Sequence, residues 1–382
     1  MAINDQVLHS HDLRRRPLLT DFKRNSTHVS IVADAPVNPR PQKPPLSLSA
    51  KIKLFAKLCR IKYLVVTPFF ISAALPYVLH QRSLYPHLGM WTACLVTGFL
   101  IQILAMLCNE YYDLEADTAN KTPSSLTGGS RILVDHLLHP SVALYGAIVV
   151  ASLIVALQFI VPALLPWYAR GRELMLIATF LSWSYSGPPL YLNYRGLGEL
   201  NAAIVVALIC PLYPAIVHLP AFDAKSVLVA LLNPFDADGA LLRNTIYAIA
   251  PFPLVYISRY CCLNINDMEG DMAANKKNWA VLFGARMTAR ISVGLQILAF
   301  VVALDQFLSG FIPLSLAIPL LGYVLPAGMY ETGRLWYLMP ASDDHVFDFI
   351  AKRPASKRAV VASTYLSIAV AFVLCVGWAI NV

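Results

Sequence analysis

Long apolar runs dominate the chain after its first sixty or so residues. Those long enough to cross a bilayer lie near 63–80, 88–112, 142–161, 173–191, 200–217, 246–264, 289–308, 311–330 and 358–380. Prolines interrupt several of these runs, and transmembrane helices tolerate proline better than soluble helices do. The pattern therefore predicts an all-α integral membrane protein in which nine transmembrane helices form a bundle.

Composition agrees with a membrane protein. Of the 382 residues, 57% are hydrophobic and only 14% are charged, which is far more apolar than an average soluble domain. The seven cysteines form no Cys-x-x-Cys pair and show no Cys/His spacing typical of zinc sites. We interpret them as small residues of the helical core.

The net charge of +8 changes this picture little. Basic residues are concentrated in the N-terminal tail and in a few loops, where the positive-inside rule explains them, so we expect no nucleic-acid partner. Residues 1–54 contain Arg14, Arg15 and Arg16 but no apolar stretch, which predicts a disordered, basic, cytosolic tail. A transmembrane catalytic domain then covers 55–382, in the endoplasmic reticulum or another internal membrane.

Two polar clusters occur at the ends of apolar runs. The first comprises Asn109, Asp113 and Asp117 and the second comprises Asn264, Asp267 and Asp271. Residues four apart share one face of a helix. With nine spans, both clusters fall on the cytosolic side. One such cluster alone is most often a solvated helix end, but two at matching ends indicate a shared site.

Neighbouring carboxylates repel one another near a bilayer unless a cation lies between them. Hard oxygen ligands suit Mg²⁺, which shares its coordination shell with waters and substrate phosphates. We therefore expect all six residues to bind Mg²⁺, with the four aspartates catalytic. An allylic prenyl diphosphate fits this arrangement, because metal ions can hold its pyrophosphate while its tail lies between helices. Metal binding favours cleavage of the C–O bond to the pyrophosphate, which leaves an allylic carbocation.

Further candidates for substrate binding lie in the same loops. Arg131, Lys276 and Arg195 could assist the leaving pyrophosphate, while Tyr112 and Tyr185 could stabilise a cation through their rings. The positive-inside rule and the aromatic belts of membrane interfaces would place such residues there in any case.

At these motifs the sequence resembles the UbiA superfamily of intramembrane prenyltransferases. The resemblance covers about residues 55–380 and implies nine transmembrane helices and Mg²⁺-dependent chemistry at two Asp-rich motifs. The stretch 128–135 and the run Gly196-Leu197-Gly198-Glu199 are most similar to the menaquinone and vitamin K branch. That branch usually has Lys at the position of Asn193 and Asp at the position of Glu199.

Two fates of the cation stay open. These departures and the hydrophilic tail favour the UbiA-type membrane terpene cyclases of fungal secondary metabolism, so we expect cyclisation of farnesyl diphosphate. The alternative is prenyl transfer to an aromatic or other small acceptor. A transporter, from another class, predicts ionisable residues near the bilayer midplane and often inverted repeats, whereas these acids lie at helix ends on one side.

Overall fold

The computed structural model describes residues 47–382 except 125, 224, 342–344, 353 and 381–382. The described residues form helices and loops and no strand. Most of the predicted tail, residues 1–46, lies outside this part of the chain. Residues 48–54 belong to helix α1 (Leu48–Leu58), which begins where the Ser47 side chain accepts a hydrogen bond from the Ala50 amide. The folded domain therefore begins before residue 55.

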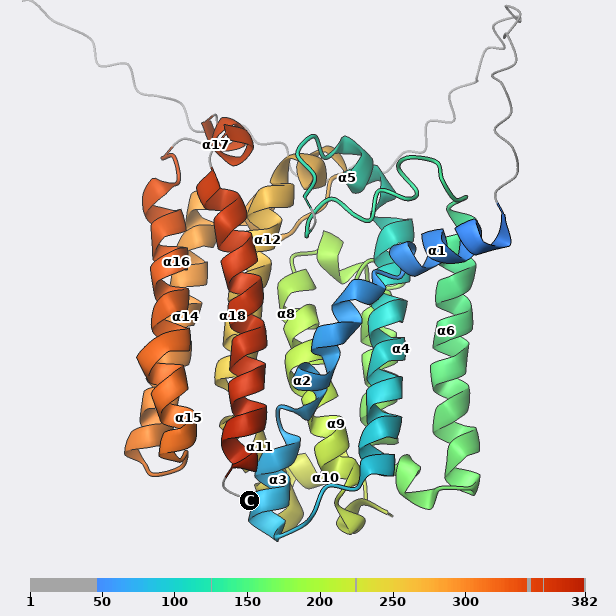
Figure 1. Cartoon of the computed structure of the whole chain (residues 1–382), viewed down its shortest axis with the longest axis vertical. Helices are drawn as coiled ribbons and strands as arrows, with labels where there is room; N and C mark the ends of the chain where they lie inside the picture. The colour runs from blue at the N-terminus through green and yellow to red at the C-terminus, as the bar shows by residue number, and fades with distance from the viewer. Residues whose placement is uncertain (1–46, 125, 224, 342–344, 353, 381–382) are drawn as a thin grey trace, which may run out of the picture. The chain divides into compact units, whose positions relative to one another are not determined.

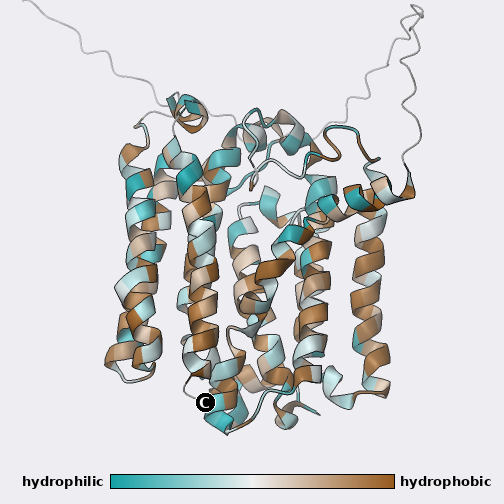
Figure 2. Ribbon diagram, viewed as in Figure 1, coloured by the Kyte–Doolittle hydropathy of each residue, from teal (hydrophilic) through white to brown (hydrophobic). Residues whose placement is uncertain are grey.

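The described helices include seven that are long and apolar enough to cross a membrane. They are η1 to α3 (Ile61–Arg82), α4 (Leu88–Tyr112), α6 with η2 (Ser141–Ala163), α8 to α9 (Gly198–Val217), α14 (Ala285–Leu308), α15 to α16 (Leu314–Leu338) and α18 (Pro354–Ala379). Helices α11 (Ala237–Ala248) and α12 (Pro251–Ala273) are bent by 45° at the break between them and add an eighth if the pair is counted as one span. The long helices run side by side (Figure 1) and are largely hydrophobic (Figure 2).

The prediction of nine full spans is not confirmed. The segment predicted at 173–191 forms helix α7 (Arg172–Ser184), which has 13 residues. Such a helix is about 20 Å long, shorter than the roughly 30 Å hydrocarbon core of a bilayer. The helix ends shortly before Pro188 and Pro189, whose nitrogens carry no hydrogen to donate to a preceding turn. An apolar run read from sequence therefore overestimated the length of this helix.

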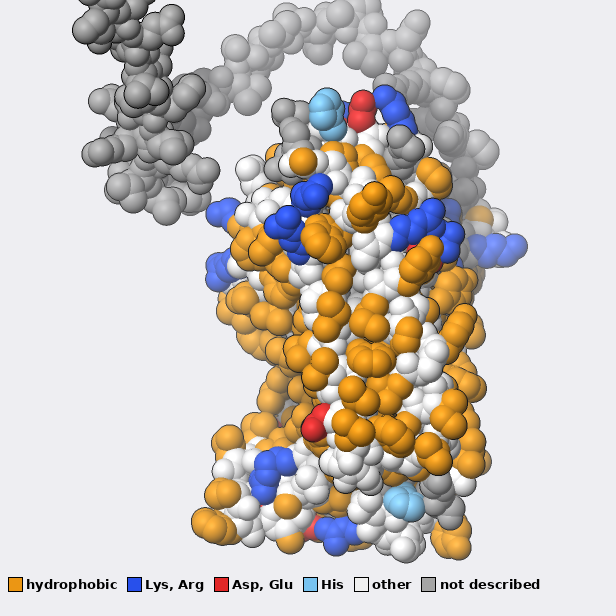
Figure 3. Space-filling view, turned by 90° about the vertical axis from the view of Figure 1, so that its left-hand side faces the viewer, with side chains coloured by type: hydrophobic (Ala, Val, Ile, Leu, Met, Phe, Trp, Pro, Cys, Tyr) orange, Lys and Arg blue, Asp and Glu red, His pale blue; other side chains and the backbone are white. Residues whose placement is uncertain are grey.

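Helix α12 lies at the centre of the packing and contacts α14, α18, α5 (Leu114–Ala119) and α8 (Gly198–Ala203). Buried hydroxyls join it to α14, because Ser258 Oγ lies 2.8 Å from Ser292 Oγ and accepts a hydrogen bond from Gln296 Nε2 at 3.1 Å. Figure 3 shows hydrophobic side chains over the middle of one face, with most Lys and Arg towards its two ends.

The two ends of the bundle differ in their polar contacts. Helices α3 (Leu75–Arg82), α10 (Val227–Leu232) and α11 lie at one end, and α5 and α17 (Val346–Lys352) lie at the other (Figure 1). At the first end an ion pair of 2.6 Å between Arg82 and Asp238 joins α3 to α11, and another of 2.7 Å links Arg170 to Asp223. The acidic motifs lie at the second end.

Candidate active site

The two acidic motifs meet in the fold. Helix α5 follows directly after α4 and packs against α12, so the first motif lies beside the second. Asn120 Nδ2 donates to Asp267 Oδ1 at 2.7 Å. Lys276 Nζ lies 2.8 Å from Asp113 Oδ2 and 3.3 Å from Asp271 Oδ1, which joins one carboxylate from each motif. The two motifs therefore lie at the same end of the bundle.

Lys276 is the central cation of this site and is 7% exposed. Burial by itself would lower the pKa of Lys276, but the carboxylates of Asp113 and Asp271 outweigh it and raise that pKa well above its usual value. The Tyr194 hydroxyl donates to Asp113 Oδ1 at 3.0 Å, and Nδ2 of the Asn278 side chain donates to Asp271 Oδ2. The lysine therefore stays charged, and both carboxylates are held in place.

Asp117 lies opposite a glycine-rich loop. Its burial, together with the nearby charges of Asp113 and Glu110, raises the pKa of Asp117 to about 7. A Cβ on Gly129 would lie 2.1 Å from Asp117 Oδ2, and Gly129 has a φ of +73°, so only glycine fits there. Arg131 donates to the backbone carbonyl of Asp117 rather than to its carboxylate.

Glu110 holds this loop and was not among the residues predicted from sequence. It is 2% exposed. Its Oε1 accepts from Arg60 Nε at 3.0 Å, from Arg60 Nη2 at 2.7 Å and from the Ser130 amide at 2.7 Å. Its Oε2 accepts from Ser130 Oγ at 2.7 Å. A carboxylate within an apolar run is costly unless it has a partner. The position of Glu110 in the run 88–112 could therefore have indicated from the sequence that it pairs with a basic residue.

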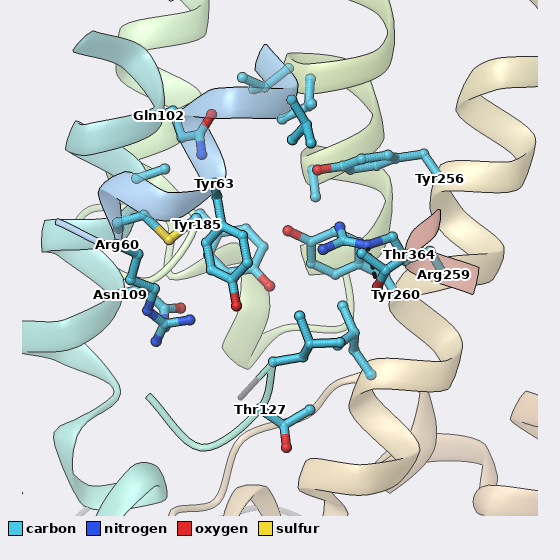
Figure 4. Close-up of a pocket in the computed structure, with 18 of the residues that line it drawn as sticks. Arg60, Tyr63, Gln102, Asn109, Thr127, Tyr185, Tyr256, Arg259, Tyr260 and Thr364 are labelled. Carbon is cyan, nitrogen blue, oxygen red and sulfur yellow. Dashed lines mark hydrogen bonds between the residues drawn. The ribbon is translucent and has the colours of Figure 1, made fainter. Parts of the chain in front are cut away.

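A cavity of about 580 Å³ opens beneath the acidic motifs. Its volume is in the range typical of small-molecule sites. All six residues of the two predicted motifs line it, as do Tyr185 and Lys276. Figure 4 shows part of the lining, where Tyr63, Tyr185, Tyr256 and Tyr260 surround the space. The cavity thus combines a charged end with an aromatic interior.

Arg259 of α12 reaches into this interior. Its Nε donates to Thr364 Oγ1 on α18 at 3.2 Å. Its guanidinium lies 5.2 Å from the ring centroid of Tyr256 and 5.5 Å from that of Tyr260. Within the described residues, no Asp or Glu forms an ion pair with it.

Other predicted residues take up positions away from the cavity lining. Arg195 is exposed, and Arg131 and Tyr112 do not line the cavity. Tyr112 instead packs edge-on against Tyr111, with ring centroids 4.9 Å apart.

The two motif asparagines line the cavity and form hydrogen bonds with neighbouring side chains. Asn264 Nδ2 donates to Glu199 Oε1 at 2.7 Å, and Asn109 Oδ1 accepts from Ser186 Oγ at 3.3 Å.

The carboxylate and amide oxygens of the two motifs are of the kind that Mg²⁺ prefers to coordinate. Among the residues that the structure describes, no three His, Cys, Asp or Glu side chains form a ready-made metal cluster. The carboxylates instead stand on two walls of one cavity, and Asp117 has space beside it that Gly129 leaves open. Such dispersed hard oxygens fit Mg²⁺, which relies on substrate phosphates and waters for part of its shell.

Residues 66–352 of the sequence match the model of the UbiA prenyltransferase family. The chain belongs to this family. It is 25% identical over 234 residues to 2-carboxy-1,4-naphthoquinone phytyltransferase of Synechocystis sp., covering 59% of this chain and 66% of that protein. It is 24% identical over 221 residues to 1,4-dihydroxy-2-naphthoate octaprenyltransferase of Bacillus subtilis, covering 57% of this chain and 63% of that protein.

The match therefore spans just under two thirds of the length of these relatives. A solved structure of digeranylgeranylglyceryl phosphate synthase has the same fold, with a TM-score of 0.53 and 13% identity, covering 86% of this chain and 99% of that one. The predicted UbiA resemblance and the all-helical membrane fold are confirmed. Both sequence relatives are named as transferases, so the comparisons favour prenyl transfer over the cyclisation that we expected.

Proposed function

We propose that this protein transfers a prenyl group from an allylic prenyl diphosphate to a small acceptor inside the membrane. The observation that carries the proposal is the convergence of both acidic motifs and Lys276 at one end of an aromatic-lined cavity between transmembrane helices. The charged end suits a pyrophosphate, and the interior suits an isoprenoid tail.

Each group at the charged end has a distinct task. Asn109, Asp113, Asp117, Asn264, Asp267 and Asp271 are the residues that would hold Mg²⁺. The bound metal would neutralise charge on the pyrophosphate and so favour cleavage of the C–O bond. Lys276 supplies a fixed positive charge next to the leaving group. Gly128 and Gly129, both with positive φ, line the cavity and let the chain approach the phosphate closely.

The interior of the cavity protects the reacting carbon. The rings of Tyr185 and Tyr260 lie 6.4 Å apart in an edge-on arrangement. Aromatic faces attract an allylic cation, and exclusion of bulk water by the bound substrates would prevent its capture as an alcohol. A positioned acceptor then forms the new bond to the prenyl carbon and loses a proton.

Arg259 also bears on the choice between transfer and cyclisation. Cyclisation moves positive charge along the prenyl chain into the cavity interior. Among the residues that the structure describes, no carboxylate pairs with the Arg259 guanidinium, which therefore repels such a charge strongly in a medium of low dielectric constant. Transfer keeps the positive charge at the acidic end, close to the carboxylates. The charge of Arg259 and the named activities of the relatives both support transfer.

The orientation in the membrane is a further part of the proposal. The positive-inside rule places the acidic end, with Lys276, Lys277 and Arg286 near it, on the cytosolic side. Water-soluble Mg²⁺ and acceptor would then enter from the cytosol, while the prenyl tail stays in the bilayer.

The test is to incubate membranes containing the protein with Mg²⁺ and farnesyl or geranylgeranyl diphosphate, with and without 1,4-dihydroxy-2-naphthoate. We expect pyrophosphate release and a prenylated product only when the acceptor is present, and neither with an Asp117→Asn variant. A cyclic hydrocarbon formed without acceptor, and absent from that variant, would instead establish a terpene cyclase. Release of pyrophosphate by the Asp117→Asn variant at the wild-type rate would contradict the role of the acidic motifs.

A further inference from the structure

We propose that Arg259 binds an anionic group of the acceptor, so that this residue selects acceptors that carry a carboxylate. The inference rests on the proposed transfer function and adds to it the residue that recognises the second substrate. It follows from the position, the partners and the charge of this one side chain.

The cavity contains two arginines in different electrostatic states. Arg60 is neutralised by Glu110, with two hydrogen bonds to the same carboxylate oxygen at 2.7 and 3.0 Å. Arg259 has no ion-pair partner within the described residues, and its side chain contacts a hydroxyl and two aromatic rings. Charged residues within membrane spans are costly and are usually kept for a function. Arg259 is thus the arginine left to attract an anion.

The position of Arg259 separates it from the diphosphate. It precedes Asp267 by eight residues on the continuous helix α12, which corresponds to about 12 Å along the helix axis. The diphosphate belongs at the acidic end beside Lys276. The isoprenoid tail is a hydrocarbon and offers nothing for a guanidinium to bind. The anion that Arg259 attracts must therefore come from another molecule in the cavity.

The surroundings of Arg259 favour a planar acceptor. Tyr256 and Tyr260 lie against its guanidinium, and Figure 4 shows Tyr185 and Tyr63 entering the same space from the other side. Thr364 fixes the Nε edge, which orients the guanidinium plane. A guanidinium held in this way presents a rigid fork that matches a carboxylate, and its weak hydration suits a buried site. An aromatic ring bearing a carboxylate would satisfy both features.

The test measures binding to the full protein in detergent with two probes that differ only in the carboxylate. They are 1,4-dihydroxy-2-naphthoate and 1,4-dihydroxynaphthalene, titrated calorimetrically under argon. We expect the wild type to bind the carboxylate probe at least tenfold more tightly. Arg259→Gln should remove this preference, and Arg259→Lys should keep part of it because it retains charge without the fork. Thr364→Val should weaken it by a smaller factor.

A matched control comes from Arg290, whose guanidinium lies 5.5 Å from the ring centroid of Trp336 and which does not line the cavity. Arg290→Gln should keep the full preference. If Arg259 only tied α12 to α18, its variants would lower the melting temperature without changing the ratio of the two affinities. An Arg259→Gln variant that keeps the preference, or a wild type that shows none, overturns the proposal.

Kinetics separate this inference from the proposed function. In the transfer assay, Arg259→Gln should raise KM for the carboxylate acceptor at least tenfold and leave KM for the prenyl diphosphate unchanged. An equal rise in both constants would contradict a role in acceptor recognition. If the wild type prefers the carboxylate probe through Arg259 but forms no prenylated product, the proposed transfer fails while the binding site stands.

Discussion

Removal of the Glu110 carboxylate would disconnect three segments around the cavity. This side chain joins α4 to Arg60, which follows α1, and to Ser130 of the glycine-rich loop. In the ion pair the Glu110 side chain is 2% exposed and that of Arg60 is 14% exposed. Breaking a buried pair by removing one partner costs about 3–5 kcal/mol. Because Arg60 retains some contact with solvent, we expect Glu110→Ala to cost about 3 kcal/mol.

The matched control is Glu331→Ala, which removes the carboxylate of another arginine pair. In that pair the Glu331 side chain is 13% exposed but the Arg358 side chain is 56% exposed, so the arginine that is left behind stays hydrated; Nη2 lies 2.6 Å from Glu331 Oε1. Exposed pairs contribute only about 0–1 kcal/mol, so this variant should unfold close to the wild-type temperature. Glu110→Gln should fall between the two, because its amide oxygen can still accept from Ser130 while the charge is lost.

The assay is thermal unfolding in detergent, followed by a thiol-reactive dye that reports exposure of the buried cysteines. Trypsin supplies a local readout, since release of Ser130 should expose the bond after Arg131 and speed its cleavage in Glu110→Ala. Equal melting temperatures for Glu110→Ala and Glu331→Ala would refute the conclusion that the buried carboxylate organises this end of the molecule. Unchanged cleavage after Arg131 would refute its role in holding the loop.

Three further outcomes are expected in the transfer assay. Gly129→Ala should lower turnover at least tenfold, because a Cβ would meet Asp117 Oδ2 at 2.1 Å, whereas Gly294→Ala meets nothing within 4 Å and should be neutral; equal activity of the two would be the contrary result. Lys276→Met should lower the rate of pyrophosphate release by roughly a hundredfold, as loss of a preorganised charge does, and Lys276→Arg should keep part of the rate. Chelation by EDTA should stop pyrophosphate release and added Mg²⁺ should restore it; activity that persists in EDTA would argue against a metal-dependent step.

Local patterns in the sequence were sufficient for part of the fold and of the site. Apolar runs located the long helices, and the four-residue spacing placed Asp113 and Asp117 near one another because helical geometry acts over a few residues. The same local rule misjudged the segment at 173–191, since hydrophobicity alone does not show where α7 stops before Pro188. Arg195 was a candidate because it is a basic residue in a loop, but its side chain is exposed and does not line the cavity.

The sequence by itself therefore determined that the chain is a helical membrane protein with two acidic motifs and a prenyltransferase resemblance. Only the tertiary structure decided which charges meet. Arg60 and Glu110 are 50 residues apart, and Lys276 and Asp113 are 163 apart. Hydrophobicity drives helices into a bilayer but does not specify which faces pack together, because lipid and helix surfaces are similarly apolar. Only the structure shows that Arg259 forms no ion pair with any Asp or Glu among the described residues.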